Sequence, residues 1–403
     1  MADLRVLLFS PLEGRDPPSG DISYTGALLD EPPPGVRYTT YQEALDEGSL
    51  RIRGRKPWHA WRDFDPGVFA ARALELGLRR ATAAFREPFW FVSIEPGRFD
   101  LLHQHLFAIH QVGPRLPVVS SAGYPLTELY RIREGWGEAH LRLALALQWT
   151  FDGLFDVHDP WLRPSGDAPM IVYTPHFRDW LIARGVPAEQ LIVGSTALPD
   201  LGLPAKRSDG FTLAIVARDF VRKGGDIALA AFRELHRDDP RWRLIIATRA
   251  GDARQNNLHA EPGIEVLVDP SRATVLKELL PATDILLAPT RGDCGAPYAM
   301  LEALQAGTCI ITASELAWLD PRLVEPPVKR TASNPAAVAS AARELAAGDM
   351  RASQRAAREL WRSGFSMGVL HERLLEAYEL ALIRERAARA APRRRRSPRR
   401  AGR

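Results

Sequence analysis

The second half of the 403-residue chain alternates short apolar runs with helical patterns, and this alternation constrains the fold more than any other feature. The runs are apolar at nearly every position, which is typical of strands covered by helices on both faces. They are FTLAIVAR (211–218), RLIIAT (243–248), IEVLV (264–268), DILLAP (284–289) and CIITAS (309–314). After the first run, DIALAAFRELH places apolar side chains at spacings of four, as a packed helix does. The pattern predicts a doubly wound α/β domain with a parallel sheet.

The first half shows the same alternation less regularly, in RVLLFSP, PFWFVSI, FDLLHQH, PVVSSAG, APMIVYTP and QLIVGST. Because the chain is too long for one ordinary core, we expect two domains. Residues 199–210 lack periodicity and form the expected linker, whereas residues 30–66 are interpreted as a loop or insertion. Two such domains would form a cleft at the carboxyl ends of their sheets, where open α/β sheets bind ligands. A long amphipathic helix near the C-terminus is expected to break near Gly364 and Gly368.

The basic character of the chain is concentrated at its end. Residues 384–403 contain ten Arg and one Glu, and because the whole chain carries +4, the preceding 383 residues carry −5. This tail is too polar and too Pro-rich to pack, and we interpret it as a disordered, solubilising end. Attraction to anionic lipid or to nucleic acid stays open as an alternative. The rest of the sequence shows no basic face, so specific binding of nucleic acid is not expected.

The apolar start, LRVLLFSP, is too short for a membrane span and lacks the flanks of a signal peptide. The two cysteines, Cys294 and Cys309, are compatible with a reducing compartment. We therefore expect a cytoplasmic protein, and the Arg-rich tail adds the hypothesis of a peripheral contact at the inner membrane face.

The stretch ARDFVRKGGD combines cations with glycines where a strand is expected to give way to a helix. Arg218 ends the strand, Lys223 lies five residues later, and Gly224 begins the Gly-Gly pair that opens the helix. A helix amino end flanked by two cations suits a diphosphate, and solvated loop charge is the alternative. The chain has five Lys against 48 Arg, so a lysine here indicates a need for a compact ammonium. The dinucleotide and P-loop fingerprints are missing, which argues against a dehydrogenase or a P-loop enzyme.

The stretches ARDFVRKGGDIALAAF, DILLAPTRGDCGAPYAMLEALQAG and GFSMGVLHERLLEAYE resemble glycosyltransferase family 4, of the GT-B architecture. FDLLHQH and the segment from IVYTPHF to the linker resemble the family in outline. The resemblance covers about residues 1–385 and implies two Rossmann-like domains facing across a cleft. It implies an acceptor-binding domain at 1–200, a donor-binding domain at 201–365, a crossover helix on the first domain at 366–385 and a disordered tail at 386–403.

The resemblance implies transfer of a hexose from a nucleotide diphosphate sugar to a hydroxyl acceptor, which is a glycan, a lipid or a small molecule. Transfer would retain the anomeric configuration and need neither a metal ion nor a cofactor. Arg218, Lys223 and a helix amino end would stabilise the negative charge of the leaving diphosphate. The leaving phosphate oxygen would itself take the acceptor's proton.

Two acidic positions follow the strand DILLAP. The resemblance implies that Glu302 accepts hydrogen bonds from the ribose hydroxyls of the nucleotide. The two oxygens of a carboxylate suit this role. The family's first acid would fall on Cys294, and Asp293 lies one residue before it. We interpret this as an expanded loop in which Asp293 reaches the sugar hydroxyls, and Gly295 and Ala296 present backbone amides to the donor. Alternatively, Asp293 only forms a turn and Cys294 fills the site as a small apolar group.

The sequence gives fewer indications of the residues that bind the acceptor. Gly20 is expected in a flexible loop near the acceptor, with a helix start capped by Asp21 as the alternative. Tyr124 lies in the region where the family often has a His. His103 and His105 occupy one face of a strand; two histidines are too few for a zinc site, so a hydrogen-bonded role is favoured, and either could contact substrate.

Two other functions remain open. The altered spacing at Asp293 is compatible with a catalytically silent GT-B protein that serves as a binding or partner subunit. A nucleotide-sugar epimerase or a phosphorylase would share the architecture, but further acidic and His residues for an epimerase are not evident, and a phosphorylase would be much longer.

Overall fold

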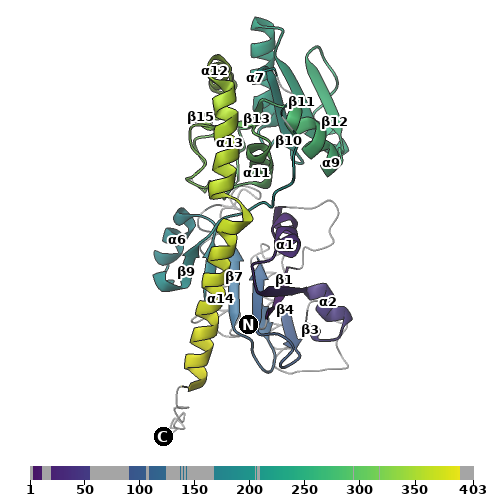
Figure 1. Ribbon diagram of the computed structural model, residues 1–403. Helices are drawn as coiled ribbons and strands as arrows, with labels where there is room; N and C mark the ends of the chain where they lie inside the picture. The colour runs from purple at the N-terminus through teal and green to yellow at the C-terminus, as the bar shows by residue number, and fades with distance from the viewer. Residues whose placement is uncertain are drawn as a thin grey trace.

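The computed structural model describes residues 3–10, 20–54, 90–105, 109–123, 137, 139, 142, 168–204, 206, 209–293, 295–316 and 318–390. Two six-stranded sheets form two domains that are stacked along the long axis of the molecule (Figure 1). Strands up to residue 193 build the first main sheet and a separate three-stranded sheet, and strands from residue 212 onward build the second main sheet. The prediction of two doubly wound domains is confirmed.

The first main sheet has the order β2-β1-β5-β7-β8-β9, and all its neighbours pair in parallel. Its strands are β1 (Leu4–Phe9), β2 (Val36–Thr40), β5 (Leu101–His105), β7 (Val118–Ala122), β8 (Met170–Val172) and β9 (Leu191–Val193). Along β1, Leu7 and Phe9 enter one core while Val6 and Leu8 enter the other. Because both faces are buried from Val6 to Phe9, this part of the strand is entirely apolar.

Helices cover both faces of this sheet. The helices α1 (Gly20–Asp30) and α14 (Met367–Ala390) contribute to the core that contains Val6. The helices α2 (Tyr41–Asp46) and α6 (Pro175–Ile182) contribute to the core that contains Leu7, and a short 3-10 helix, η2 (Ala188–Gln190), precedes β9.

The second sheet has the order β12-β11-β10-β13-β14-β15 and is also parallel. Its strands are β10 (Thr212–Ala217), β11 (Arg243–Thr248), β12 (Ile264–Val268), β13 (Ile285–Ala288), β14 (Cys309–Ala313) and β15 (Val328–Thr331). The core on one face includes α7 (Gly225–Asp238) and α12 (Pro335–Ala347). The core on the other includes α11 (Tyr298–Gln305), α13 (Met350–Gly364) and the segments η3 (Val275–Leu279) and α10 (Leu280–Ala282), which follow α9 (Arg272–Thr274). A short helix, α8 (Ala250–Gln255), follows β11.

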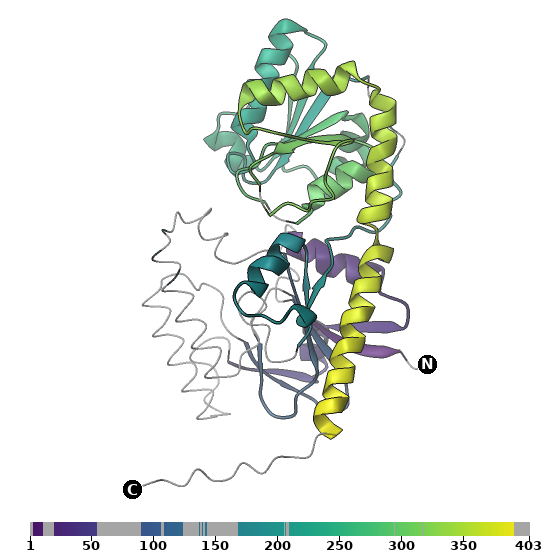
Figure 2. The ribbon, with the colours of Figure 1, turned by 90° about the vertical axis from the view of Figure 1, so that its left-hand side faces the viewer.

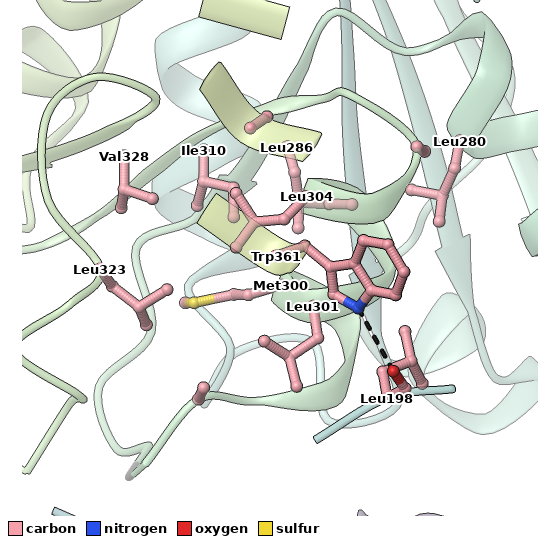
Figure 3. Packing of buried hydrophobic residues seen from close by; sticks show 14 of the residues in the cluster. Leu198, Leu280, Leu286, Met300, Leu301, Leu304, Ile310, Leu323, Val328 and Trp361 are labelled. Carbon is pink, nitrogen blue, oxygen red and sulfur yellow. Dashed lines mark hydrogen bonds between the residues drawn. The ribbon is translucent and has the colours of Figure 1, made fainter. Parts of the chain in front are cut away.

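Trp361 joins the second core to the linker. Its indole lies among the leucines of α11 and α10, and its Nε1 donates to the carbonyl of Leu198 at 3.3 Å (Figure 3). The amide of Leu198 in turn donates to the carbonyl of Phe365 at 2.9 Å. The two segments that pass between the domains are therefore hydrogen-bonded to each other.

The C-terminal helix crosses back to the first domain, as predicted. After a break at residues 365 and 366, α14 runs along the side of the first domain (Figure 2). Its apolar side chains recur every three or four residues and are buried there, as in a helix with one packed face. They are Met367, Leu370, Leu374, Ala377, Tyr378 and Ala381. The helix extends five residues beyond the predicted end at 385.

Two parts of the sequence interpretation are wrong. Residues 36–54, read as loop, form β2, α2 and β3 (Leu50–Gly54), because short elements with few apolar residues give little periodicity. PFWFVSI forms β4 (Trp90–Ile94), which pairs with β3 and with β6 (Ile109–Gln111) in a separate three-stranded sheet. The remainder of the 30–66 segment from residue 55, and the tail from residue 391, lie outside the described residues.

In the described part of the chain, no helix combines the length and apolarity that crossing a bilayer requires.

Candidate functional site

The turn between β10 and α7 requires glycine at two consecutive positions. Gly224 has a φ of 76°, and a Cβ there would collide with the carbonyl oxygen of Pro289, which follows β13. A Cβ on Gly225 would collide with the ring of Phe220. The Gly-Gly pair thus lets the start of α7 approach the loop after β13 closely. Lys223 stands directly before this close approach.

Hydrogen bonds tie these two loops together at the carboxyl edge of the sheet. Arg222 Nη1 donates to the carbonyl of Gly292 at 2.9 Å, and the amide of Arg291 donates to the carbonyl of Arg222 at 2.8 Å. Arg291 also pairs with Asp226 in the first turn of α7, at 2.7 Å. Residues seventy positions apart in sequence are therefore fixed relative to each other.

Lys223 and Asp293 form an ion pair across these loops. The Lys223 Nζ lies 2.6 Å from Oδ1 and 2.7 Å from Oδ2 of Asp293, and both side chains are largely buried. The structure thus brings together two residues that the sequence assigned to one site. Each neutralises the other here, so an anionic ligand at Lys223 would have to displace the carboxylate.

The amino end of α7 is already occupied in part by an internal anion. Arg291, which donates to both oxygens of the Asp226 carboxylate, lowers the pKa of Asp226 most, and the backbone amides of Asp226 and Ile227 act in the same direction. The helix amino end therefore contributes less to a diphosphate than the sequence suggested. Lys223 supplies a concentrated positive charge next to the amino end of α7.

Glu302 lies in the middle of α11 with its side chain 13% exposed. Burial raises the pKa of Glu302, and the charges of Arg272 and Arg218 act in the opposite direction. Arg272 Nη2 donates to Oε1 of Glu302 at 2.9 Å. Arg218, the residue directly after β10, therefore interacts electrostatically with Glu302. This is expected if the two residues belong to one site. Arg272 did not emerge from the sequence, where it is one arginine among 48.

The loop before α11 differs from its predicted role. The amide of Gly295 donates to the carbonyl of Trp318 at 2.8 Å, so it is not available to a donor as predicted. Gly295 has a φ of 62°, and Ala296 is buried with its carbonyl accepting from Thr196 Oγ1 at 2.6 Å. The loop is therefore held by the backbone of residue 318 and by Thr196, which follows β9.

The two histidines of β5 are buried in a hydrogen-bonded chain. His103 Nε2 lies 3.0 Å and His105 Nδ1 2.9 Å from the same Ser121 Oγ, as expected for residues on one strand face. Burial lowers the pKa of His103 to about 3 and that of His105 well below its usual value. Both rings are therefore neutral at physiological pH.

The series of hydrogen-bonded side chains continues from His103 to the crossover helix, α14. His103 Nδ1 lies 2.7 Å from the hydroxyl of Tyr378 in α14, which lies 2.8 Å from the hydroxyl of Tyr38 in β2. Ser121 has one hydroxyl proton, so it can donate to at most one of the two histidines and must accept from at least one of them. The tautomers of the two histidines are consequently coupled to each other and to α14.

Tyr173, after β8, lies between the predicted acceptor side and the second domain. Its hydroxyl is 3.4 Å from His105 Nδ1, and a Cβ on Gly295 would lie 3.6 Å from its side chain. His176 in α6 makes a T-shaped contact with Trp318, with ring centroids 4.5 Å apart. The carboxyl edge of the first sheet thus touches the loop that precedes α11.

Three predicted positions give little structural information. Gly20 is the first residue of α1, so Asp21 lies inside the first turn and does not precede the helix as a cap. Tyr124 and Cys294 lie outside the described residues. Within the described ranges, no cluster of three or more His, Cys, Asp or Glu side chains could hold a metal ion.

Residues 210–347 match the family model of glycosyl transferases group 1. No curated protein sequence matches the chain. The match covers the second sheet and the loops that carry Lys223, Asp293 and Glu302.

Solved structures share the whole fold at low sequence identity. A glycosyltransferase from Rickettsia africae is 12% identical with a TM-score of 0.57, over 94% of this chain and 99% of that one. Anabaena HepE, crystallised with UDP and glucose, is 13% identical with a TM-score of 0.57, over 93% and 99%. Sucrose-phosphate synthase from Thermosynechococcus elongatus is 14% identical with a TM-score of 0.56, over 96% and 100%. The fold is GT-B, and the group 1 domain supports a glycosyltransferase.

Proposed function

We propose that this chain transfers a hexose from a nucleotide diphosphate sugar to a hydroxyl acceptor, with retention of configuration and without a metal ion. The group 1 match supports glycosyl transfer, and the UDP and UDP-glucose complexes of Anabaena HepE support a nucleotide-sugar donor. The Lys223–Asp293 pair carries the proposal, because it places a compact cation and a carboxylate together at the carboxyl edge of the second sheet.

In the proposed reaction, the bond from the anomeric carbon to the diphosphate oxygen breaks and a bond to the acceptor oxygen forms. The acceptor's proton passes to the leaving phosphate oxygen. Negative charge grows on the diphosphate as the bond breaks, and Lys223 and Arg218 stabilise it in place of a metal ion. Once the diphosphate has taken Lys223, the Asp293 carboxylate is released to accept from sugar hydroxyls.

The nucleoside is held at Glu302 in this account. An ionised carboxylate accepts strong hydrogen bonds from hydroxyls, and its two oxygens match two neighbouring ribose hydroxyls. The hydroxyl acceptor is assigned to the edge of the first domain near His105. A cytoplasmic location and a contact of the tail with anionic lipid remain parts of the proposal.

Turnover of a nucleotide-sugar panel tests the proposal. We expect the full chain to release nucleoside diphosphate from one donor, and that donor at a hundredfold excess over Kd should stabilise the fold by about 2.7 kcal/mol. Lys223→Ala should lower turnover by about 10²–10³-fold, because a charge-stabilising donor is lost. Lys277→Ala is the control, since Lys277 is exposed in the same domain.

A chain that neither binds nor turns over any nucleotide sugar would refute the proposal. Saturable donor binding without turnover would instead favour a catalytically silent binding protein. Turnover unchanged in Lys223→Ala would remove the assigned role of that residue.

A further inference from the structure

Arg272 lies where the nucleoside of a bound donor would be recognised. It begins α9, directly after the turn that follows β12, and it reaches Glu302 in α11, thirty residues later. The two elements follow different strands of the second sheet, so only the tertiary fold brings the two side chains together. A contact of 2.9 Å joins Arg272 Nη2 to Glu302 Oε1.

The contact matters because Glu302 sits in surroundings that disfavour its charge. Its neighbours Leu301 and Ala303 are fully buried, and the Glu302 side chain is 13% exposed. Burial raises the pKa of Glu302, and Arg272 is the larger of the two influences that lower it, ahead of Arg218. Glu302 is the largely buried partner of this pair, so removing the half-exposed Arg272 would leave the carboxylate charge without its nearest cation.

The geometry of the pair leaves hydrogen-bonding capacity for a ligand. Arg272 engages Oε1, and among the described residues no hydrogen bond to Oε2 is present. A guanidinium has five N–H donors, and the Arg272 side chain is 45% exposed. One carboxylate oxygen and several guanidinium N–H groups of the pair therefore keep hydrogen-bonding capacity beyond their mutual contact.

We propose that Arg272 is a specificity-determining residue that orients the Glu302 carboxylate, so that the site selects nucleoside diphosphates with an intact ribose. This inference rests on the proposed function, in which Glu302 binds the ribose. Arg272 acts through Glu302 and is a positioning residue.

An ordinary surface ion pair in the same domain provides the contrast. Arg233 and Glu261 lie 2.8 Å apart, but their side chains are 55% and 30% exposed, and such pairs contribute little to stability. Arg233→Gln is therefore the matched control: it breaks an Arg–Glu pair of similar length elsewhere in the domain.

The experiment measures Kd for ADP, GDP, UDP and CDP, and then for the 2′-deoxy form of the tightest binder. We expect the wild-type chain to prefer the ribose form about tenfold, as one charge-assisted hydrogen bond would give. Glu302→Gln should remove this preference at every pH. Arg272→Gln should weaken it, more strongly at pH 6 than at pH 8.5, because Arg218 alone then opposes protonation of the buried Glu302. Arg272→Lys should retain it, and Arg233→Gln should match the wild type.

The other possible results distinguish a failure of this inference from a failure of the proposed function. If Glu302→Gln loses the ribose preference while Arg272→Gln keeps it at both pH values, Arg272 is no determinant and the proposed function stands. If both variants keep the preference, the inference is wrong. A wild-type chain that binds none of the four nucleotides would overturn the inference and the proposed function together. Thermal unfolding of each variant checks that the fold is intact.

Discussion

Lys223 and Asp293 place opposite charges in direct contact, and a diphosphate must compete with the carboxylate for the ammonium. Removing the charge of Asp293 should therefore strengthen the binding of a nucleoside diphosphate that carries no sugar. It should slow the transfer of the sugar. We expect Asp293→Asn to tighten nucleoside diphosphate binding by about fivefold, which corresponds to about 1 kcal/mol. Turnover of the nucleotide sugar should fall in the same variant. Calorimetric Kd values and product release, measured side by side, check both directions; weaker nucleotide binding would contradict the competition.

Gly224 is the residue on which the close approach of the two loops depends. A Cβ at its φ of 76° is strained, and the carbonyl of Pro289 occupies the space that it needs. Gly224→Ala should lower the unfolding free energy by about 1–3 kcal/mol and weaken donor binding. Gly251→Ala is the control, since a Cβ there meets nothing within 4 Å and alanine favours the helix. Equal stabilities of the two variants would show that the turn does not need glycine.

Residue-level prediction succeeded where loop chemistry and strand order suffice. Arg218, Lys223 and Glu302 follow neighbouring parallel strands, so their common edge could be predicted. The ion pair of Arg272 could not, because nothing local distinguishes that arginine from a solvated one. The occupied amide of Gly295 was missed for a similar reason: its acceptor at residue 318 is set by the tertiary fold.

Helix α14 contributes a hydroxyl to the interior of the first domain as well as an apolar face. Tyr378 bridges Tyr38 and His103; Tyr378 and His103 are buried, and Tyr38 is partly buried. Tyr378→Phe should lower the unfolding free energy by about 1–3 kcal/mol, because it leaves buried polar groups without their partner. Chemical denaturation provides the measurement.

A double-mutant cycle tests whether the hydrogen-bonded side chains of Tyr38 and Tyr378 are energetically coupled. Tyr38→Phe combined with Tyr378→Phe should cost less than the two single variants together, since both remove the same hydrogen bond. Strict additivity would contradict the coupling between β2 and α14.

At the level of elements, continuous apolar runs were the reliable signal. Every run quoted from the second half became a strand of one parallel sheet, because helices bury both of its faces. The strand β2 was missed because VRYTT lies at the sheet edge, is buried only at its two ends and holds little apolar sequence. The strand β15 was missed for the same reason, since VKRT also lies at an edge.

The stability of the whole molecule should depend on pH through the neutral histidines. The folded chain keeps the pKa of His103 at about 3, whereas an unfolded chain returns it to 6.5, and His105 shifts in the same direction. The unfolded state therefore binds more protons below pH 6.5, and stability falls as pH falls. Between pH 7 and 5.5 we expect the unfolding free energy to drop by roughly 2 kcal/mol.

Denaturant titrations at the two pH values measure this drop. His259→Gln is the control, because His259 is exposed and its removal should leave the pH dependence unchanged. A flat profile between pH 7 and 5.5 would show that the two histidines of β5 are not held neutral.

The central claim is that the carboxyl edge of the second sheet binds a nucleotide diphosphate sugar through Lys223 and Glu302. The most direct measurement is a crystal structure of the full chain with bound nucleoside diphosphate. The account predicts the diphosphate within hydrogen-bond distance of Lys223 Nζ, with Asp293 displaced, and the ribose on Glu302 beside Arg272. A nucleotide bound elsewhere, such as in the pocket of about 230 Å³ lined by Arg233 and His259, would contradict it.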